Sequence, residues 1–120
     1  MKYMLLMYTD PAHTRAMSEA ELGIVRHKHE ALRNELTESG ELLNGAGLVF
    51  PEETTVVRLG AAGATTEKGP FATGSVEHVT AYYVIETAVA DRARNLAEHL
   101  LDDHVTAVEI REIHDSVGMG

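Results

Sequence analysis

The chain has 120 residues, 44% of them apolar and 24% charged, a composition that predicts one compact domain and argues against disorder or several domains. Its formal net charge is −9, from 19 acidic against 10 basic residues, and such a chain would repel phosphate backbones, so we expect no nucleic-acid partner. There are no cysteines, which excludes disulfides, thiolate metal sites and thiol nucleophiles.

The first predicted element is a strand over residues 2–8. Its apolar side chains fall on both faces, and a strand of this kind is normally covered on both sides, so we expect it at the centre of a sheet. Asp10-Pro11 then ends the strand in a turn. The apolar run is far shorter than the roughly 20 residues of a membrane span, and it lacks the features of a signal peptide. We therefore expect a cytoplasmic protein with no membrane partner.

A helix is predicted to follow. Ser18 and Glu21 have the spacing of a capping box, and Gly40 supplies the left-handed residue that commonly ends a helix. Between them, one helical face carries the apolar residues Leu22, Val25, Leu32 and Leu36. His29 fills the gap in this stripe, so its side chain is predicted to point toward the core.

The middle of the chain is less periodic. Residues 41–48 and 54–59 predict a second strand and its continuation or a hairpin, interrupted by glycines and by Pro51. Residues 60–75 are rich in Gly, Ala and Thr, which predicts the longest loop of the protein. A long loop is a place where functional residues are often found.

The last three elements complete the predicted fold. Residues 79–86 predict a strand, residues 89–101 a helix with Ala93 and Leu96 on its inner side, and residues 105–113 a final, partly polar strand. This order is that of a split βαβ, ferredoxin-like α+β sandwich, a single domain over residues 1–120 with both helices on one face of the sheet.

The other face of such a sheet would be bare. More apolar side chains are available than two helices can cover, and the usual remedy is a symmetric dimer. We therefore predict a homodimer in which two sheets pack face to face as a dimeric α+β barrel. The residues expected to supply this surplus are Tyr3, Met4, Tyr8, Val57, Tyr82 and Tyr83.

The seven histidines do not predict a metal site. His27 and His29 lie about 200° apart around a helix, so they cannot bind one ion from the same face. His99 and His104 straddle a helix end with no third ligand nearby, and no H-E-x-x-H motif is present. No phosphate-cradling glycine loop follows a strand either, so no cofactor is predicted.

His29 and Asp10 are the candidate catalytic pair. An imidazole within an apolar stripe is either a hydrogen-bonded core residue or a neutral base, and both interpretations stay open. Asp10, at the exit of the first strand, could orient that ring as a carboxylate partner, or could simply be a turn residue before Pro11.

The sequence also resembles the YCII-related family. The segment Arg26-His27-Lys28-His29, followed by Leu42-Leu43 and Gly45, resembles the R-x-x-H helix and the G-x-L-L-x-x-G strand entry of that family. Gly69-Pro70-Phe71-Ala72 and Tyr82-Tyr83-Val84-Ile85 are similar to its DGPF branch. Lys68 departs from this branch, because it replaces the aspartate of the Asp-Gly-Pro-Phe motif. The resemblance covers nearly the whole chain and implies that His29 and Asp10 are the catalytic pair.

These observations lead to three hypotheses on function. The first is a small isomerase- or lyase-like enzyme that moves a proton on a small, acidic organic molecule, a reaction class that the resemblance supplies. The second is a homodimeric ligand-binding or accessory module without catalysis, and the third is a protein that acts only through its dimer interface. Arg58, at a strand end, could bind an anion or be an exposed strand arginine. The predicted substrate contacts are Arg58, Arg26, Lys68, Phe71 and His78.

Overall fold

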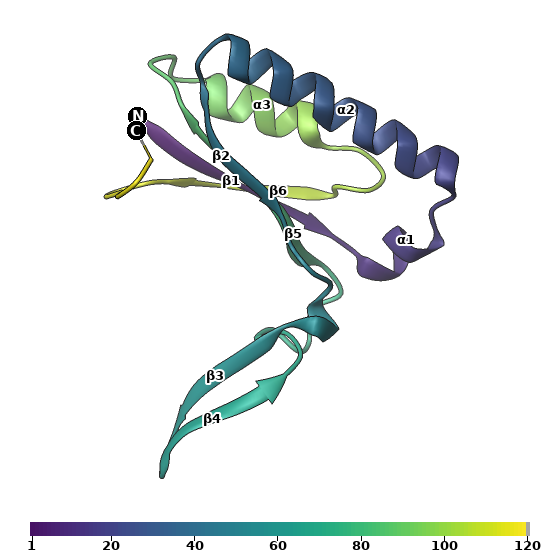
Figure 1. Ribbon diagram of the computed structural model, residues 1–120, viewed down its shortest axis with the longest axis vertical. Coiled ribbons are helices and arrows are strands. Elements are labelled where there is room, and N and C mark those ends of the chain that lie inside the picture. Colours follow the sequence, from purple (N-terminus) through teal and green to yellow (C-terminus); the bar gives the residue numbers. More distant parts are fainter. Residues whose placement is uncertain (120) are drawn as a thin grey trace.

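A computed structural model describes residues 1–119 as a small α+β protein with an antiparallel sheet (Figure 1). Its strands and helices follow the predicted order, with two short helices and one further strand added. The elements are β1 (Lys2–Thr9), α1 (Pro11–Ala16), α2 (Glu19–Glu38), β2 (Leu42–Gly47), the 3₁₀ turn η1 (Pro51–Glu53), β3 (Thr55–Gly60), β4 (Gly63–Lys68), β5 (His78–Glu86), α3 (Arg92–Leu100) and β6 (Ala107–Glu112).

The main sheet has the strand order β2-β5-β1-β6, with antiparallel neighbours throughout. The first strand lies in its interior, as its two apolar faces predicted. Leu5, Met7 and Thr9 of β1 are buried on one face, whereas Met4, Leu6 and Tyr8 are half-buried on the other. Alternation with a period of two therefore gives this strand two chemically usable faces.

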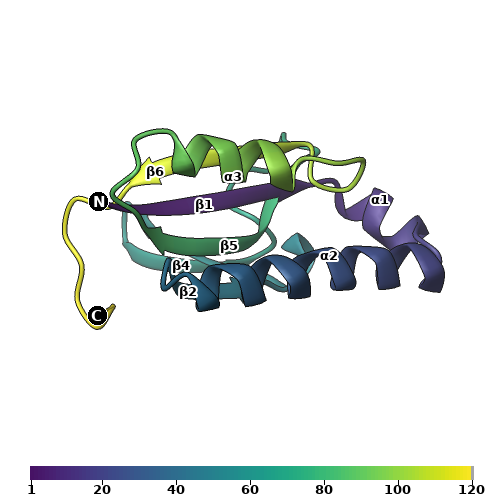
Figure 2. The same cartoon turned by 90° about the horizontal axis from the view of Figure 1, so that it is seen from above.

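Helices α2 and α3 cover the same face of the sheet. Seen from above, α3 lies over β6 and β1, and α2 runs along the side of β2 and β5 (Figure 2). The core between the two layers contains Leu5, Met7, Leu32, Leu36, Tyr83, Ile85, Ala93, Leu96, Leu100 and Val105. Burial of these apolar side chains is the main force that holds the helices on the sheet.

The long helix α2 begins and ends where its sequence predicts. Ser18 Oγ accepts a hydrogen bond from the N–H of Glu21 at 3.1 Å, and the Glu21 carboxylate accepts one from the N–H of Ser18 at 3.0 Å. Gly40, just past the helix, has a φ of +78°, the left-handed conformation that glycine adopts without strain. Only Leu32 and Leu36 of the predicted stripe are buried, because the first half of α2 extends beyond the sheet (Figure 1).

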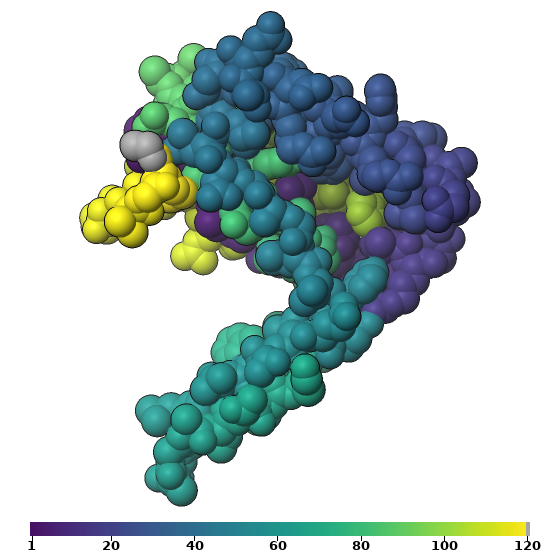
Figure 3. Space-filling model, in the orientation of Figure 1, coloured from purple at the N-terminus to yellow at the C-terminus, as the bar shows by residue number. Residues whose placement is uncertain are grey.

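The prediction of one long loop over residues 60–75 is wrong. Residues 63–68 form β4, which pairs with β3 in a two-stranded sheet of its own, separate from the main sheet. This hairpin, residues 55–68, is called the arm below; it projects away from the helices and the main sheet (Figure 3). The radius of gyration, 16.2 Å, exceeds the roughly 14 Å typical of a compact chain of this length.

The helix-free face of the main sheet is partly apolar. Met4, Leu6, Tyr8 and Tyr82 are half-buried there. Of the other residues predicted to supply a surplus, Tyr83 is buried in the core, Tyr3 packs against the core, and Val57 lies on the arm. The bare face is therefore smaller than predicted, and the arm carries exposed apolar side chains such as Leu59.

The C-terminal half agrees with the predicted elements within a few residues. Helix α3 begins at Arg92, three residues after the predicted start, and Leu101 lies outside it and is exposed. Lys2 donates hydrogen bonds to Ser116 Oγ at 3.3 Å and to the carbonyl of Met119 at 3.2 Å, so the two ends of the chain lie together. Among residues 1–119, no helix is both long enough and apolar enough to cross a membrane.

Candidate functional site

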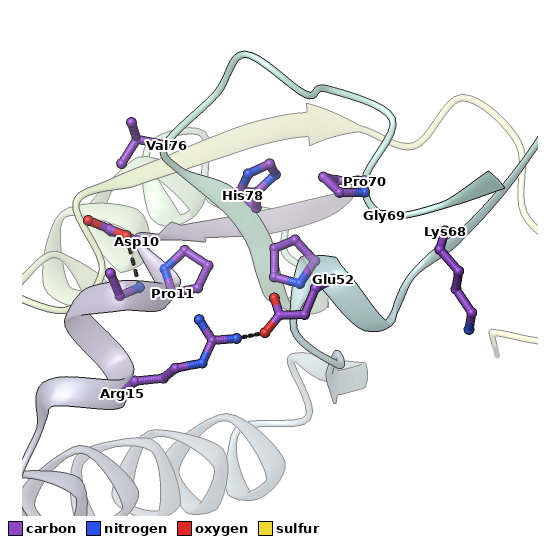
Figure 4. A pocket seen from close by; sticks show the side chains of 11 residues that line it. Asp10, Pro11, Arg15, Glu52, Lys68, Gly69, Pro70, Val76 and His78 are labelled. Carbon is purple, nitrogen blue, oxygen red and sulfur yellow. Dashed lines mark hydrogen bonds and ion pairs between the residues drawn. The ribbon is translucent and has the colours of Figure 1, made fainter.

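The candidate site is a cavity of about 490 Å³ at the edge of the main sheet where β1 ends and β5 begins. Three of the residues predicted from the sequence line it: Asp10, Lys68 and His78. It is called the Asp10–His78 cavity below. Its other polar walls come from Arg15 of α1 and Glu52 of η1, so segments far apart in the sequence meet here (Figure 4).

Asp10 occupies the junction between β1 and α1. Its Oδ1 accepts a hydrogen bond from the backbone N–H of Ala12 at 3.0 Å, which caps the short helix. Pro11 takes the first helical position, where a missing N–H costs nothing. The turn interpretation of Asp10 is thus confirmed for one carboxylate oxygen. Within residues 1–119, no protein group bonds the other oxygen, which is left for water or a ligand.

His78 lies beside Asp10 because of the strand register. It is the first residue of β5 and pairs with Thr9, the residue that precedes Asp10. Its imidazole is half-buried and, in Figure 4, lies between Asp10 on one side and Pro70 on the other. Neither ring nitrogen bonds a protein group in the part of the chain that the structure describes. A ligand in the cavity can therefore reach both a carboxylate and an imidazole.

Arg15 is a site residue that the sequence interpretation missed. Its guanidinium forms an ion pair with Glu52 and lies over the ring of Phe50, with Cζ 4.2 Å from the ring centroid. These two contacts tie α1 to η1 and hold the cationic group at the cavity wall. The short helix α1 has too few residues for a periodic pattern, so only the Pro11 that starts it could have indicated this placement.

The loop after β4, which begins with Gly69 and Pro70, forms the side of the cavity that faces the arm. Gly69 has a φ of +105°, which favours glycine, and its N–H donates to the carbonyl of Thr54 at 2.8 Å. Lys68 is exposed, and its side chain runs away from His78 in Figure 4. Lys68 is therefore at the cavity margin, where its charge contributes more to the surrounding field than to a direct contact.

His29 lies elsewhere, on the helix face of the sheet. Its Nδ1 is 2.8 Å from the phenol oxygen of Tyr83, and either atom is the donor according to the imidazole tautomer. Burial lowers the pKa of His29 from its ordinary value of 6.5, and the neighbouring Lys28 lowers it further. Among residues 1–119, no hydrogen bond or ion pair joins His29 to Asp10. The residue has the surroundings of a hydrogen-bonded core histidine.

The remaining predicted contacts are dispersed. Arg58 belongs to the arm, where its Nε donates to Glu67 at 3.3 Å and its Cζ lies 4.7 Å from the centroid of the Phe71 ring. Phe71 is 72% exposed. Arg26 is exposed on α2, away from the residues that line the Asp10–His78 cavity. These side chains do not converge on the cavity within this single chain.

A second, larger hollow adjoins the candidate site. It measures about 800 Å³, has mostly apolar walls and lies at the base of the arm on the side of Tyr8. Phe71 lines it, and His78, Pro51 and Pro70 line both this hollow and the Asp10–His78 cavity. A bound molecule could therefore have a polar part beside Asp10 and an apolar part at the base of the arm.

The chemistry available at the site is that of carboxylate, imidazole and guanidinium groups. Within the described residues, no three or more His, Asp or Glu side chains are grouped so as to hold a metal ion. Neither a comparison with models of known protein families nor a search of curated proteins finds a match. The function must therefore be argued from the site itself.

Proposed function

We propose that this chain binds a small organic acid in the Asp10–His78 cavity and transfers a proton on it, with His78 and Asp10 as the acid/base groups. The observation that carries the proposal is that a carboxylate and an imidazole, both free to bond a ligand, line one cavity with an arginine. Imidazole is the side chain best suited to give and take protons near neutral pH. His78 takes the part that was predicted for His29.

The anion would be held by Arg15 rather than by Arg58. The guanidinium of Arg15 is positioned by Glu52 and Phe50, and its remaining N–H groups suit a carboxylate. Arg58 already bonds Glu67 on the arm and the carbonyl of Phe71 just beyond it. The acidic partner Glu52 keeps the cavity from being strongly cationic, which fits a single negative charge better than a multiply charged ligand.

The proposal extends to family and assembly. The motifs around Arg26, Leu42 and Gly69 support a divergent member of the YCII-related family, with a ferredoxin-like fold. The half-buried apolar residues on the helix-free face support a homodimer with two sheets packed face to face. Sedimentation equilibrium tests the dimer: Tyr82→Glu should give a particle of one chain mass and Ile24→Glu, on exposed α2, a particle of two.

A proton-exchange assay tests the catalytic proposal. The protein is incubated in D₂O with pyruvate or 4-oxopentanoate, whose protons beside the ketone are weakly acidic, and their loss is followed by ¹H NMR. We expect exchange above the buffer rate, slowed on the order of 100-fold by His78→Gln or Asp10→Asn. His29→Gln is the control, and a fold check by circular dichroism accompanies each variant. Full loss with His29→Gln but not with His78→Gln would contradict the proposal.

A second function, binding without catalysis, is favoured by one observation. No hydrogen bond joins His78 to Asp10 in the described part of the chain, whereas a catalytic imidazole is commonly oriented by a carboxylate. Saturable binding of 4-oxopentanoate that depends on Arg15 but causes no exchange would support this binding module. Absence of both binding and exchange would refute both functions for these acids.

A further inference from the structure

A further cavity, of about 400 Å³, shares no described lining residue with the Asp10–His78 cavity. Leu48, Val49 and Glu53 also line the apolar hollow at the base of the arm. The polar walls of the further cavity are the side chains of Thr9, Thr14, Thr80, His104 and Glu53, and it is called the threonine cavity below. Its apolar walls come from the segment between β2 and η1, residues 48–50. None of its polar lining residues was singled out as a substrate contact from the sequence.

An irregularity in strand pairing creates one wall of the threonine cavity. Met7 pairs with Ala81, but the next residue, Tyr8, pairs with Val79, so Thr80 is an extra residue in β5. A bulge of this kind re-aims a side chain. Thr80 Oγ1 lies 2.9 Å from Thr9 Oγ1, on the buried face of β1. Regular alternation would have put Thr80 on the opposite face, with Tyr82.

The opposite wall is a histidine whose backbone is firmly held. Asp102 Oδ1 accepts hydrogen bonds from the N–H groups of His104 at 2.8 Å and of Val105 at 2.6 Å. Lys28 Nζ lies 3.1 Å from the other carboxylate oxygen of Asp102. The loop that carries His104 is thus tied to α2, which holds the backbone from which the imidazole extends.

The two contacts of the Thr14 hydroxyl bear on the roles of the ring nitrogens of His104, which depend on the imidazole tautomer. Thr14 Oγ1 is 3.4 Å from the carbonyl of Asp10, which can only accept, and 3.4 Å from His104 Nδ1. A hydroxyl has one hydrogen, so if it is donated to the carbonyl, the ring contact is donated by Nδ1–H. Nε2 is then an acceptor. Burial lowers the pKa of His104, which favours this neutral imidazole.

We propose that the threonine cavity is a binding site for a small uncharged molecule that has a hydroxyl or carbonyl group next to an apolar body. The hydroxyls and the imidazole supply donors and acceptors, and Leu48, Val49 and Phe50 supply the apolar contact. Among residues 1–119, no lysine or arginine lines the cavity and Glu53 is its one charged wall residue, which repels anions. The ligand class therefore differs from that of the Asp10–His78 cavity.

Three probes of equal size test this assignment: benzyl alcohol, benzoate and benzylamine. Each is titrated into ¹⁵N-labelled protein, and the backbone N–H signals of Thr9, Thr14, Thr80 and His104 are followed by NMR. Benzyl alcohol should shift these signals saturably at millimolar concentration, and benzoate should not. Tighter binding of either charged probe at these signals, or no saturable shift with benzyl alcohol, would overturn the assignment.

Two variants separate binding from folding. Thr80→Val keeps the side-chain shape but removes the hydroxyl, and it should weaken benzyl alcohol binding about threefold to tenfold, the value of one hydrogen bond. Val49→Trp fills the cavity from an exposed position, 60% exposed, without removing a buried atom. Because Val49 also lines the apolar hollow, loss of the saturable shift is judged at Thr14, Thr80 and His104, which line the threonine cavity but not that hollow, and we expect it to be complete. Thr66→Val on the arm is the matched control and should leave binding unchanged. Unaltered affinity in both cavity variants would refute the site.

Discussion

The hydrogen bond between His29 and Tyr83 can be measured as a coupling energy. Tyr83 is 4% exposed and its phenol oxygen is 2.8 Å from His29 Nδ1, so each group satisfies the other. A buried polar group that loses its partner costs about 1–3 kcal/mol. Tyr83→Phe leaves the half-buried imidazole, which water can still reach, so we expect the low end, about 1 kcal/mol.

The companion change is His29→Leu, which keeps side-chain volume and removes the imidazole partner of the Tyr83 hydroxyl. We expect this variant to lose about 1–2 kcal/mol, and the double variant to lose less than the sum of the two. The difference, a coupling energy on the order of 1 kcal/mol, is the quantity that the structure predicts.

Urea unfolding at neutral pH, followed by circular dichroism, measures all four proteins. The slope of unfolding free energy against urea should stay constant, since the surface exposed on unfolding hardly changes. A loss of about 1 kcal/mol should lower the melting temperature by roughly 4 °C in a chain of this size. A coupling energy below about 0.3 kcal/mol would mean that the two side chains are not bonded in solution, and would reopen the catalytic interpretation of His29.

Three further predictions concern stability. Ser18→Ala removes one half of the capping box and should cost about 1 kcal/mol in urea unfolding, with Thr37→Ala, at an exposed position of the same helix, as a control that should not destabilise the protein. Gly45→Ala should destabilise the protein, because the new Cβ would lie 2.8 Å from a ring carbon of the buried Tyr83; an unchanged melting temperature would contradict this. Burial lowers the pKa of His29 and of His104, so below about pH 6.5 the unfolded chain binds more protons than the folded one. The free energy of unfolding should therefore be greatest above this pH and should fall as the pH drops through the folded-state pKa values. Urea unfolding should accordingly give a lower midpoint at about pH 5 than at about pH 7.5.

The predictable parts of the fold are those with a strong local pattern. The two apolar faces of Lys2–Thr9 indicated an interior strand, and the capping box at Ser18 fixed where α2 begins. The helix α1 was missed because six residues carry no period. Strand β4 was taken for loop because its exposed residues, Gly63–Lys68, show no apolar alternation, although Thr65 and Thr66 favour strands.

The candidate site was predictable only in its residue types. Asp10, Lys68 and His78 were singled out, but their meeting depends on the register of β1 and β5, which no local pattern reveals. His29 was correctly turned toward the core, yet its partner is Tyr83 rather than Asp10, because that choice depends on where α2 crosses the sheet. The bulge that turns the Thr80 side chain could not be predicted either, because the sequence of β5 alternates as a regular strand does.

Sequence changes in the arm can alter the wall of the cavity with little change in the stability of the fold. Within the described residues, the strands of the arm pair only with each other, in a sheet separate from that of the core, and Arg58 bonds the carbonyl of Phe71 beyond the arm. Substitutions in the arm, along residues 55–68, should therefore leave cooperative unfolding nearly unaltered. At its base, however, Lys68 to Pro70 form part of the wall of the Asp10–His78 cavity. Changes in the length and chemistry of this hairpin would therefore alter one wall of the Asp10–His78 cavity, while the sheet and helices that keep the protein folded remain as they are.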